Sequence, residues 1–85
     1  GMGMFDRPKG LALDSENHLY VIDSAFSNFQ IFDQDGNLLL FVGNYGEDPG
    51  LFRLPSGIFI DKNDRIYVAD QINRRVQIFQ YLKGN

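Results

Sequence analysis

The chain has 85 residues, enough for one small domain at most. It carries 8 lysine and arginine residues against 11 aspartate and glutamate residues, a net charge of −3, so no overall positive field would attract nucleic acid. It contains no cysteine, which excludes disulfides and thiolate metal sites. No apolar run approaches the roughly 20 residues of a membrane-spanning helix, and no export signal is visible. We therefore expect a soluble chain with no membrane contact and no cofactor, in a compartment that the sequence leaves open.

The first half of the sequence predicts four short strands. Apolar runs lie at residues 10–14, 19–23, 29–33 and 38–42, with polar turns between them. In the second run, Leu19 and Val21 share one face of the strand while Tyr20 and Ile22 share the other. Both faces are apolar, which is typical of a strand packed from both sides and not of a free-standing hairpin. Helix is nowhere favoured.

The second half repeats this plan with one strand fewer. A glycine-rich segment, residues 44–54, is followed by apolar runs at 57–61, 66–70 and 76–82. We therefore expect a lead-in over 1–7, with Gly1 as a remnant of tag cleavage, a first unit over 8–43, a crossover over 44–54 and a second unit over 55–85. The second unit lacks an outer strand in the sequence.

The two units are copies of one repeat. A shift of 47 residues aligns Pro8 with Pro55 without a gap. The same shift pairs several further positions: Phe5 with Phe52, Gly10 with Gly57, Asp14 with Asp61, Tyr20 with Tyr67, Asp23 with Asp70 and Gln30-Ile31-Phe32 with Gln77-Ile78-Phe79. A period of roughly 40 to 50 residues built from short strands indicates a β-propeller, in which each blade is a four-stranded antiparallel sheet that must stack on its neighbours. The predicted fold is all-β, with two blades per chain.

The second unit resembles an NHL repeat. The resemblance rests on residues 52–58 (FRLPSGI), 66–70 (IYVAD) and 73–79 (NRRVQIF). The first unit departs from the pattern, because Phe26 and Asn28 stand where the second unit has Asn73 and Arg75. Residues 76–82 look like the last blade of a bacterial NHL protein. The resemblance implies two NHL-type blades of a ring that usually has six.

A pair of blades leaves two apolar faces to be covered. Six blades at two per chain require three chains, so we expect a homotrimer that closes the ring. Other ring sizes, and a role as one part of a longer propeller, remain open.

Candidate site residues lie in the loops. Asp23 and Asp70 end the second strand of each unit, and either bind a polar partner or accept hydrogen bonds that hold their loops. Arg75, with Asn73, either recognises a carboxylate or phosphate, or ties its loop to Asp70 or a neighbouring carbonyl. The second alternative is favoured in each case. For Asp23 and Asp70 the reason is their presence in both units, because a scaffold residue is needed in every blade.

Two further motifs receive structural interpretations. The segment Asp33-Gln34-Asp35-Gly36-Asn37 has some features of a calcium loop but lacks its closing glutamate, so a hairpin turn is the better interpretation. His18, the single histidine, lies in a predicted surface turn with no partner in the sequence. No motif for a nucleophile, a phosphate cradle or a metal cluster is present.

The sequence favours a protein-interaction scaffold without catalysis of its own. The expected partner-binding rim comprises Asp23, Phe26, Tyr45, Asp70, Asn73 and Arg75, and the partner is an unidentified protein. The alternative is a fragment of a propeller hydrolase or lyase with a metal in its central channel, although the inner strands offer few ligands for one. Nucleic acid is disfavoured by the acidic balance, although Arg53, Arg65, Arg74 and Arg75 could form a local basic face.

Overall fold

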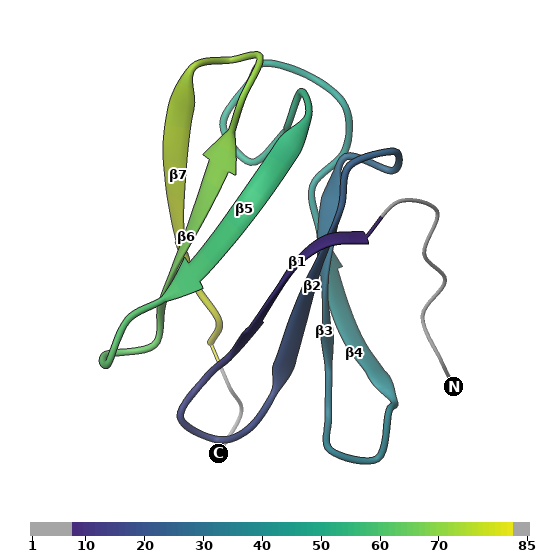
Figure 1. The fold of residues 1–85 in the computed structure, drawn as a ribbon, viewed down its shortest axis with the longest axis vertical. Coiled ribbons are helices and arrows are strands. Elements are labelled where there is room, and N and C mark those ends of the chain that lie inside the picture. The colour runs from purple at the N-terminus through teal and green to yellow at the C-terminus, as the bar shows by residue number, and fades with distance from the viewer. Residues whose placement is uncertain (1–7, 83–85) are drawn as a thin grey trace.

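The computed structural model describes residues 8–82, which form two antiparallel sheets and contain no helix. The first sheet has the order β1-β2-β3-β4, with bounds Pro8–Leu13, Leu19–Asp23, Asn28–Phe32 and Leu38–Val42 (Figure 1). The second has the order β5-β6-β7, with bounds Pro55–Ile60, Arg65–Asp70 and Arg75–Gln80. The predicted all-β class, with one sheet of four strands and one of three, is confirmed.

The repeat extends to the register of the strands. In the first sheet Pro8 pairs with Asp23 and Gly10 with Ile22, so a bulge lies between these two pairs. In the second sheet Pro55 pairs with Asp70, Gly57 with Ala69, and the bulge recurs. The strands β1 and β5 therefore begin two residues before the predicted apolar runs, at the prolines that the 47-residue shift aligns.

One turn design occurs three times at the edge of the sheets opposite the crossover. In each turn an aspartate Oδ1 accepts the backbone N–H groups of the residues two and four positions further on, at 2.9–3.0 Å. The residue before the last has a positive φ: 63° at Asn17, 83° at Gly36 and 63° at Asp64. The aspartates are Asp14, Asp33 and Asp61. The hairpin interpretation of residues 33–37 is confirmed, and Asp14 and Asp61 are turn residues instead of strand ends.

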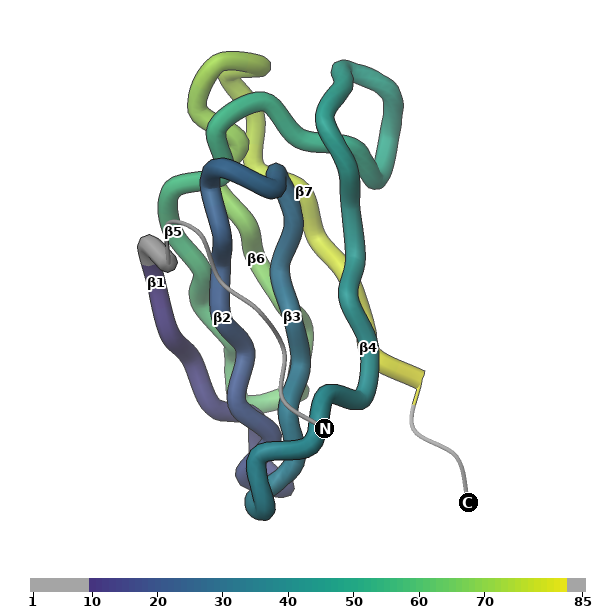
Figure 2. Tube along the Cα trace, turned by 90° about the vertical axis from the view of Figure 1, so that its right-hand side faces the viewer, coloured from purple at the N-terminus to yellow at the C-terminus, as the bar shows by residue number. Residues whose placement is uncertain are grey.

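The two sheets pack face to face around one core. Fully buried side chains come from the first sheet, from β6 and from the segment between the sheets: Tyr20, Ile22, Phe29, Ile31, Ile66, Val68 and Phe52. A Cβ at Gly10 would lie 3.5 Å from Cγ2 of Ile58, an ordinary van der Waals distance, so β5 packs against β1 at this position. Figure 2 shows β1 and β5 at one edge of the molecule and β4 at the other. No helix within residues 8–82 is long and apolar enough to cross a membrane.

Candidate interaction surface at the loop edge

Three connecting segments meet at the end of the molecule drawn uppermost in Figure 1, which we call the loop edge: residues 24–27, 44–54 and 71–74. The backbone N–H of Gln71 donates to the carbonyl of Leu54 at 3.1 Å, and that of Ile72 donates to the carbonyl of Arg53 at 3.1 Å. A parallel bridge between Tyr45 and Phe52 closes the crossover on itself. The β6–β7 loop and the crossover therefore form one joined surface.

Asp70 connects the crossover to the β6–β7 loop. Its side chain is fully buried at the end of β6. Oδ1 accepts the backbone N–H of Arg53 at 2.7 Å, while Oδ2 accepts Nδ2 of Asn73 at 2.7 Å and Nε of Arg75 at 3.3 Å. A buried carboxylate is stable only when it is paired and hydrogen-bonded, and these three donors meet that need. Asp70 thus holds the crossover to the end of its own strand.

Side chains of the second blade also bind the carbonyls of the crossover. Arg75 donates through Nη2 to the carbonyls of Asp48 at 3.0 Å and Leu51 at 2.8 Å. Asn73 donates to the carbonyl of Gly46 at 2.9 Å. The prediction that Arg75 ties its loop to Asp70 and to neighbouring carbonyls is confirmed.

Gln77 completes this set and was not among the predicted site residues. Its Nε2 donates to the carbonyl of Leu51 at 2.7 Å, and its Oε1 accepts the N–H of Gly50 at 2.8 Å. The only signal in the sequence was its alignment with Gln30 in the first unit. These side chains add to the backbone hydrogen bonds within the crossover and satisfy further backbone groups of this segment.

In the first blade, Asp23 holds the loop between β2 and β3. Asp23 is fully buried, and its Oδ1 accepts the N–H groups of Ala25 at 2.9 Å and Phe26 at 3.1 Å. The loop-holding interpretation of Asp23 is confirmed. Phe26, at the position of Asn73, instead leaves its ring 47% exposed.

Large apolar side chains are exposed on this firmly held surface. Tyr45 is 65% exposed and Ile72 is 57% exposed, alongside the exposed ring of Phe26. The guanidinium of Arg53 lies 5.5 Å from the centre of the Tyr45 ring, a cation–π arrangement that orients the ring. Ile72 was missed by sequence reasoning, because no pattern distinguishes an exposed loop isoleucine from a core one. Of the six predicted rim residues, Phe26 and Tyr45 are exposed, and the other four hold the loops.

At the opposite edge, the prediction that His18 has no partner is wrong. Its Nδ1 lies 2.9 Å from Oδ2 of Asp14, and its ring meets that of Tyr81 edge-on with centroids 5.7 Å apart. Burial disfavours the charged form of Asp14, but hydrogen bonds from His18, Glu16 and Tyr20 outweigh it and lower the pKa of this carboxyl to about 2. Burial and the Asp14 carboxylate raise the pKa of Tyr20. These contacts organise a turn.

Metal-ligating side chains do not cluster in the described part of the chain. Within residues 8–82, no group of three or more histidine, cysteine, aspartate or glutamate residues could hold a metal ion.

Two face-packed antiparallel sheets related by a 47-residue repeat are blades of a β-propeller. Residues 10–83 match the DUF5128 family, described as a 6-bladed beta-propeller, and the chain belongs to that family. No curated protein matches the chain.

Proposed function

We propose that the chain is a pair of NHL-type blades that serves as a protein-interaction scaffold, binding an unidentified protein partner through the loop edge without catalysis of its own. We call the sheet of β1–β4 blade 1 and the sheet of β5–β7 blade 2. The NHL assignment is supported by blade 2, in which Asp70, Asn73 and Arg75 of the NHL-like segments form one hydrogen-bonded unit. Membership of a 6-bladed propeller family is consistent with this proposal, since such folds commonly carry binding sites on loops supported by a rigid frame.

The observation that carries the proposal is the exposure of Phe26, Tyr45 and Ile72 on loops whose backbone is tightly held. Exposed aromatic and apolar side chains on a preorganised surface are suited to the centre of a protein interface. In this arrangement Asp23, Asp70, Asn73 and Arg75 keep the loops in place, and the exposed residues contact the partner.

Replacement of Phe26, Tyr45 and Ile72 by serine tests the loop edge. Immobilised wild-type chain and triple variant would be compared for proteins retained from a lysate of the source cells, with quantification by mass spectrometry. We expect at least one protein retained by the wild type to fall more than tenfold with the variant. A Lys62→Ser variant, altered at the opposite edge, should retain it. If the triple variant retains the same proteins in the same amounts, the loop edge is not the binding surface.

We further propose that copies of the chain associate through their outer blade faces, with a homotrimer closing six blades. The support is a comparison of equivalent positions. Phe29 and Ile31 of β3, which face blade 2, are each 1% exposed, whereas their counterparts Val76 and Ile78 are 60% and 61% exposed. The outer face of blade 2 is therefore exposed to solvent, whereas the equivalent face of blade 1 is buried against blade 2.

The complementary surface lies on blade 1. Leu11 and Leu13 of β1 are 67% and 59% exposed, whereas their counterparts in β5, Ile58 and Ile60, pack on the core. Gly10 contacts Ile58, but a Cβ at its counterpart Gly57 would meet nothing within 4 Å. A second copy could therefore place Leu11 against Gly57, as Ile58 lies against Gly10. Burial of these apolar faces would favour association.

Light scattering on a sizing column tests this assembly. We expect a particle of three times the 9.7 kDa mass of one chain. Ile78→Asp places a charge on the outer face of blade 2 and should reduce the particle to one chain. Gln34→Asp, on an exposed turn away from both faces, should leave the trimer intact. A wild-type chain that is stably monomeric would overturn the proposal.

A hydrolase or lyase with a metal in its central channel remains the alternative function. No contact or cluster within residues 8–82 favours it over the scaffold.

A further inference from the structure

One face of each blade carries an equivalent set of side chains, because directly opposed residues of paired strands point to the same face. In blade 2 this face looks toward blade 1, and its members include Ile58, Val68, Gln77 and Phe79. The 47-residue shift gives their counterparts in blade 1 as Leu11, Val21, Gln30 and Phe32. In blade 1 this face looks away from blade 2, which packs against the opposite face. We call it the outer face of blade 1.

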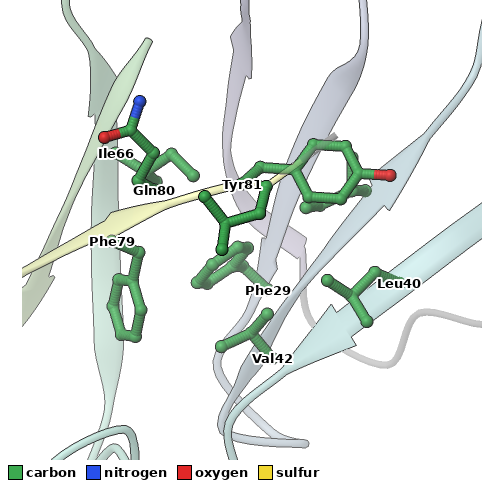
Figure 3. A pocket seen from close by; sticks show the side chains of 9 residues that line it. Phe29, Leu40, Val42, Ile66, Phe79, Gln80 and Tyr81 are labelled. Carbon is green, nitrogen blue, oxygen red and sulfur yellow. The ribbon is translucent and has the colours of Figure 1, made fainter. Parts of the chain in front are cut away.

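In blade 2, two parts of the molecule cover the equivalent face. Blade 1 covers the β5 side, where Ile58 packs on the shared core. The crossover covers the β7 side, because the ring of Phe79 meets that of the buried Phe52 with centroids 5.8 Å apart. Figure 3 shows Phe79 in the space between the blades. The crossover also binds the amide of Gln77, at residues 50–51.

In blade 1, the two sides of the outer face differ in exposure. Leu11, on the β1 side, is 67% exposed. Gln30 and Phe32 of β3 are only 4% and 6% exposed, and Val21 of β2 is buried beside them. The exposed side is the one that a neighbouring blade covers in blade 2. The buried side is the one that the crossover covers there.

The lead-in is the counterpart of the crossover for blade 1. Residues 1–7 lie outside the described residues, but the 47-residue shift aligns residues 4–7 (MFDR) with residues 51–54 (LFRL). It pairs Phe5 with Phe52, and each segment ends at the proline that begins the first strand of its blade.

We propose that residues 4–7 form a strap across the β3 side of the outer face of blade 1. The ring of Phe5 lies on Phe32, and the amide of Gln30 binds the backbone of the strap, as Phe52 and Gln77 do in blade 2. The strap leaves Leu11 uncovered, so it does not compete with the docking of a second copy and does not depend on that assembly.

The loop end of the same face offers further groups to the strap. Asp23 is fully buried and is the counterpart of Asp70, which accepts the N–H of Arg53. The N–H of Asp6 has the position of that donor in the aligned segment. Asn28 is 9% exposed, and its Oδ1 has no hydrogen-bond partner among residues 8–82. A buried acceptor without a partner is costly, which favours a segment with backbone N–H groups at this end.

A tryptophan in place of Phe5 tests the strap, because the chain contains no tryptophan of its own. In Phe5→Trp we expect emission at shorter wavelength than in the control Met2→Trp, and an acrylamide quenching constant at least threefold lower. Met2 aligns with Pro49, which is exposed. The two variants should be quenched equally in concentrated urea. Equal quenching of the two folded chains would overturn the proposal.

Gln30→Ala tests whether this face holds the strap. Added to Phe5→Trp, it should raise the quenching constant at least twofold, because the backbone of the strap loses its amide partner. Gln34→Ala, at an exposed turn, should leave the constant unchanged. Circular dichroism checks that the sheets persist in both chains. Quenching that Gln30→Ala does not alter would mean that position 5 is covered elsewhere, contrary to the proposal.

Ile78→Asp separates the chain's own blade from a second copy as the cover. The low quenching of Phe5→Trp should persist in chains that also carry Ile78→Asp and that light scattering shows to be single. A rise to the level of Met2→Trp would assign the protection to a second copy and refute the strap.

A second measurement applies if the larger indole ring prevents folding. Phe5→Ser should raise the equilibrium constant for unfolding in urea at least tenfold, because an apolar contact with Phe32 is lost. Met2→Ser should change it less than twofold. Equal effects of the two substitutions would show that Phe5 does not pack on the blade.

Discussion

Asp14 and Asp61 show how one side chain can organise a turn and the strand behind it. In each repeat the carboxylate accepts two backbone N–H groups of its turn and the hydroxyl of a tyrosine on the following strand, Tyr20 or Tyr67, at 3.0 Å. Burial opposes the ionisation of Asp14, but its hydrogen bonds prevail; at Asp61 the backbone bond from Arg65 is the largest influence. Both carboxyls have their pKa lowered from 3.8 to about 2.

These lowered pKa values predict acid sensitivity. A carboxyl with a lower pKa in the folded state than in the unfolded state stabilises the fold above the unfolded pKa, and that contribution is lost as the pH falls through the folded pKa. The free energy of unfolding should therefore decline as the pH is lowered from about 4 to about 2. Urea denaturation at a series of pH values measures this, and Asp14→Asn should flatten the decline. The matched substitution Asp35→Asn, at an exposed position, should leave the dependence of unfolding free energy on pH as in the wild type. If Asp14→Asn also leaves this dependence unchanged, the lowered pKa of Asp14 does not stabilise the fold.

Arg75 and Arg74 are neighbours with different roles. Arg75 donates to Asp70 and to two carbonyls of the crossover, whereas Arg74 is exposed. Arg75→Met should lower the free energy of unfolding by about 1–3 kcal/mol, because the buried Asp70 carboxylate and the Leu51 carbonyl lose a donor. Arg74→Met should change it by less than about 0.5 kcal/mol. Chemical denaturation compares the two, and equal losses would show that these contacts do not stabilise the fold.

At the level of single residues, the sequence could predict which positions hold the loops but not all of their partners. The repetition of Asp23 and Asp70 indicated a structural role in every blade. One donor to Asp70, the N–H of Arg53, comes from 17 residues earlier in the chain. That contact depends on how the crossover folds back, which no local pattern encodes. The partner of His18 could have been found, since Asp14 precedes it by four residues in a turn.

At the scale of elements, short apolar runs bounded by polar turns predicted all seven strands, with ends displaced by one or two residues. Several of these displacements lie where backbone geometry sets the strand end: at the bulges after Pro8 and Pro55, and at the aspartates that begin the turns. The course of the crossover could not be predicted, because glycine-rich segments carry no periodicity.

Gly43 tests whether the crossover depends on backbone geometry. Its φ is +106°, and a Cβ there would lie 2.4 and 2.5 Å from two ring carbons of the buried Phe52. Gly43→Ala should therefore lower the free energy of unfolding through both strain and overlap, by about 1–3 kcal/mol more than Gly36→Ala. Gly36 has a φ of +83° but open space around it, so it isolates the cost of strain. Thermal and urea denaturation of both variants measure the two losses of unfolding free energy. Equal losses would mean that the Phe52 ring moves aside at little energetic cost.

At the scale of the whole molecule, the core belongs to neither blade alone. Phe29 of β3, Phe52 of the crossover and Phe79 of β7 are mutually in ring contact, with centroids 5.3–6.3 Å apart. The sequence could predict that the blades stack, because both faces of the central strands are apolar.

The fastening of residues 44–54 has a consequence for how such a chain could grow by duplication. The side chains of Asp70, Asn73, Arg75 and Gln77, all in the blade that follows, form hydrogen bonds with the backbone of this segment. A unit that contains both the segment before a blade and that blade therefore carries both partners of these hydrogen bonds. If such a unit were duplicated, each copy would contain both the side chains and the backbone groups that hydrogen-bond to each other. A copy that began at Pro55 would lack the backbone groups of residues 44–54 with which Asp70, Asn73, Arg75 and Gln77 form hydrogen bonds.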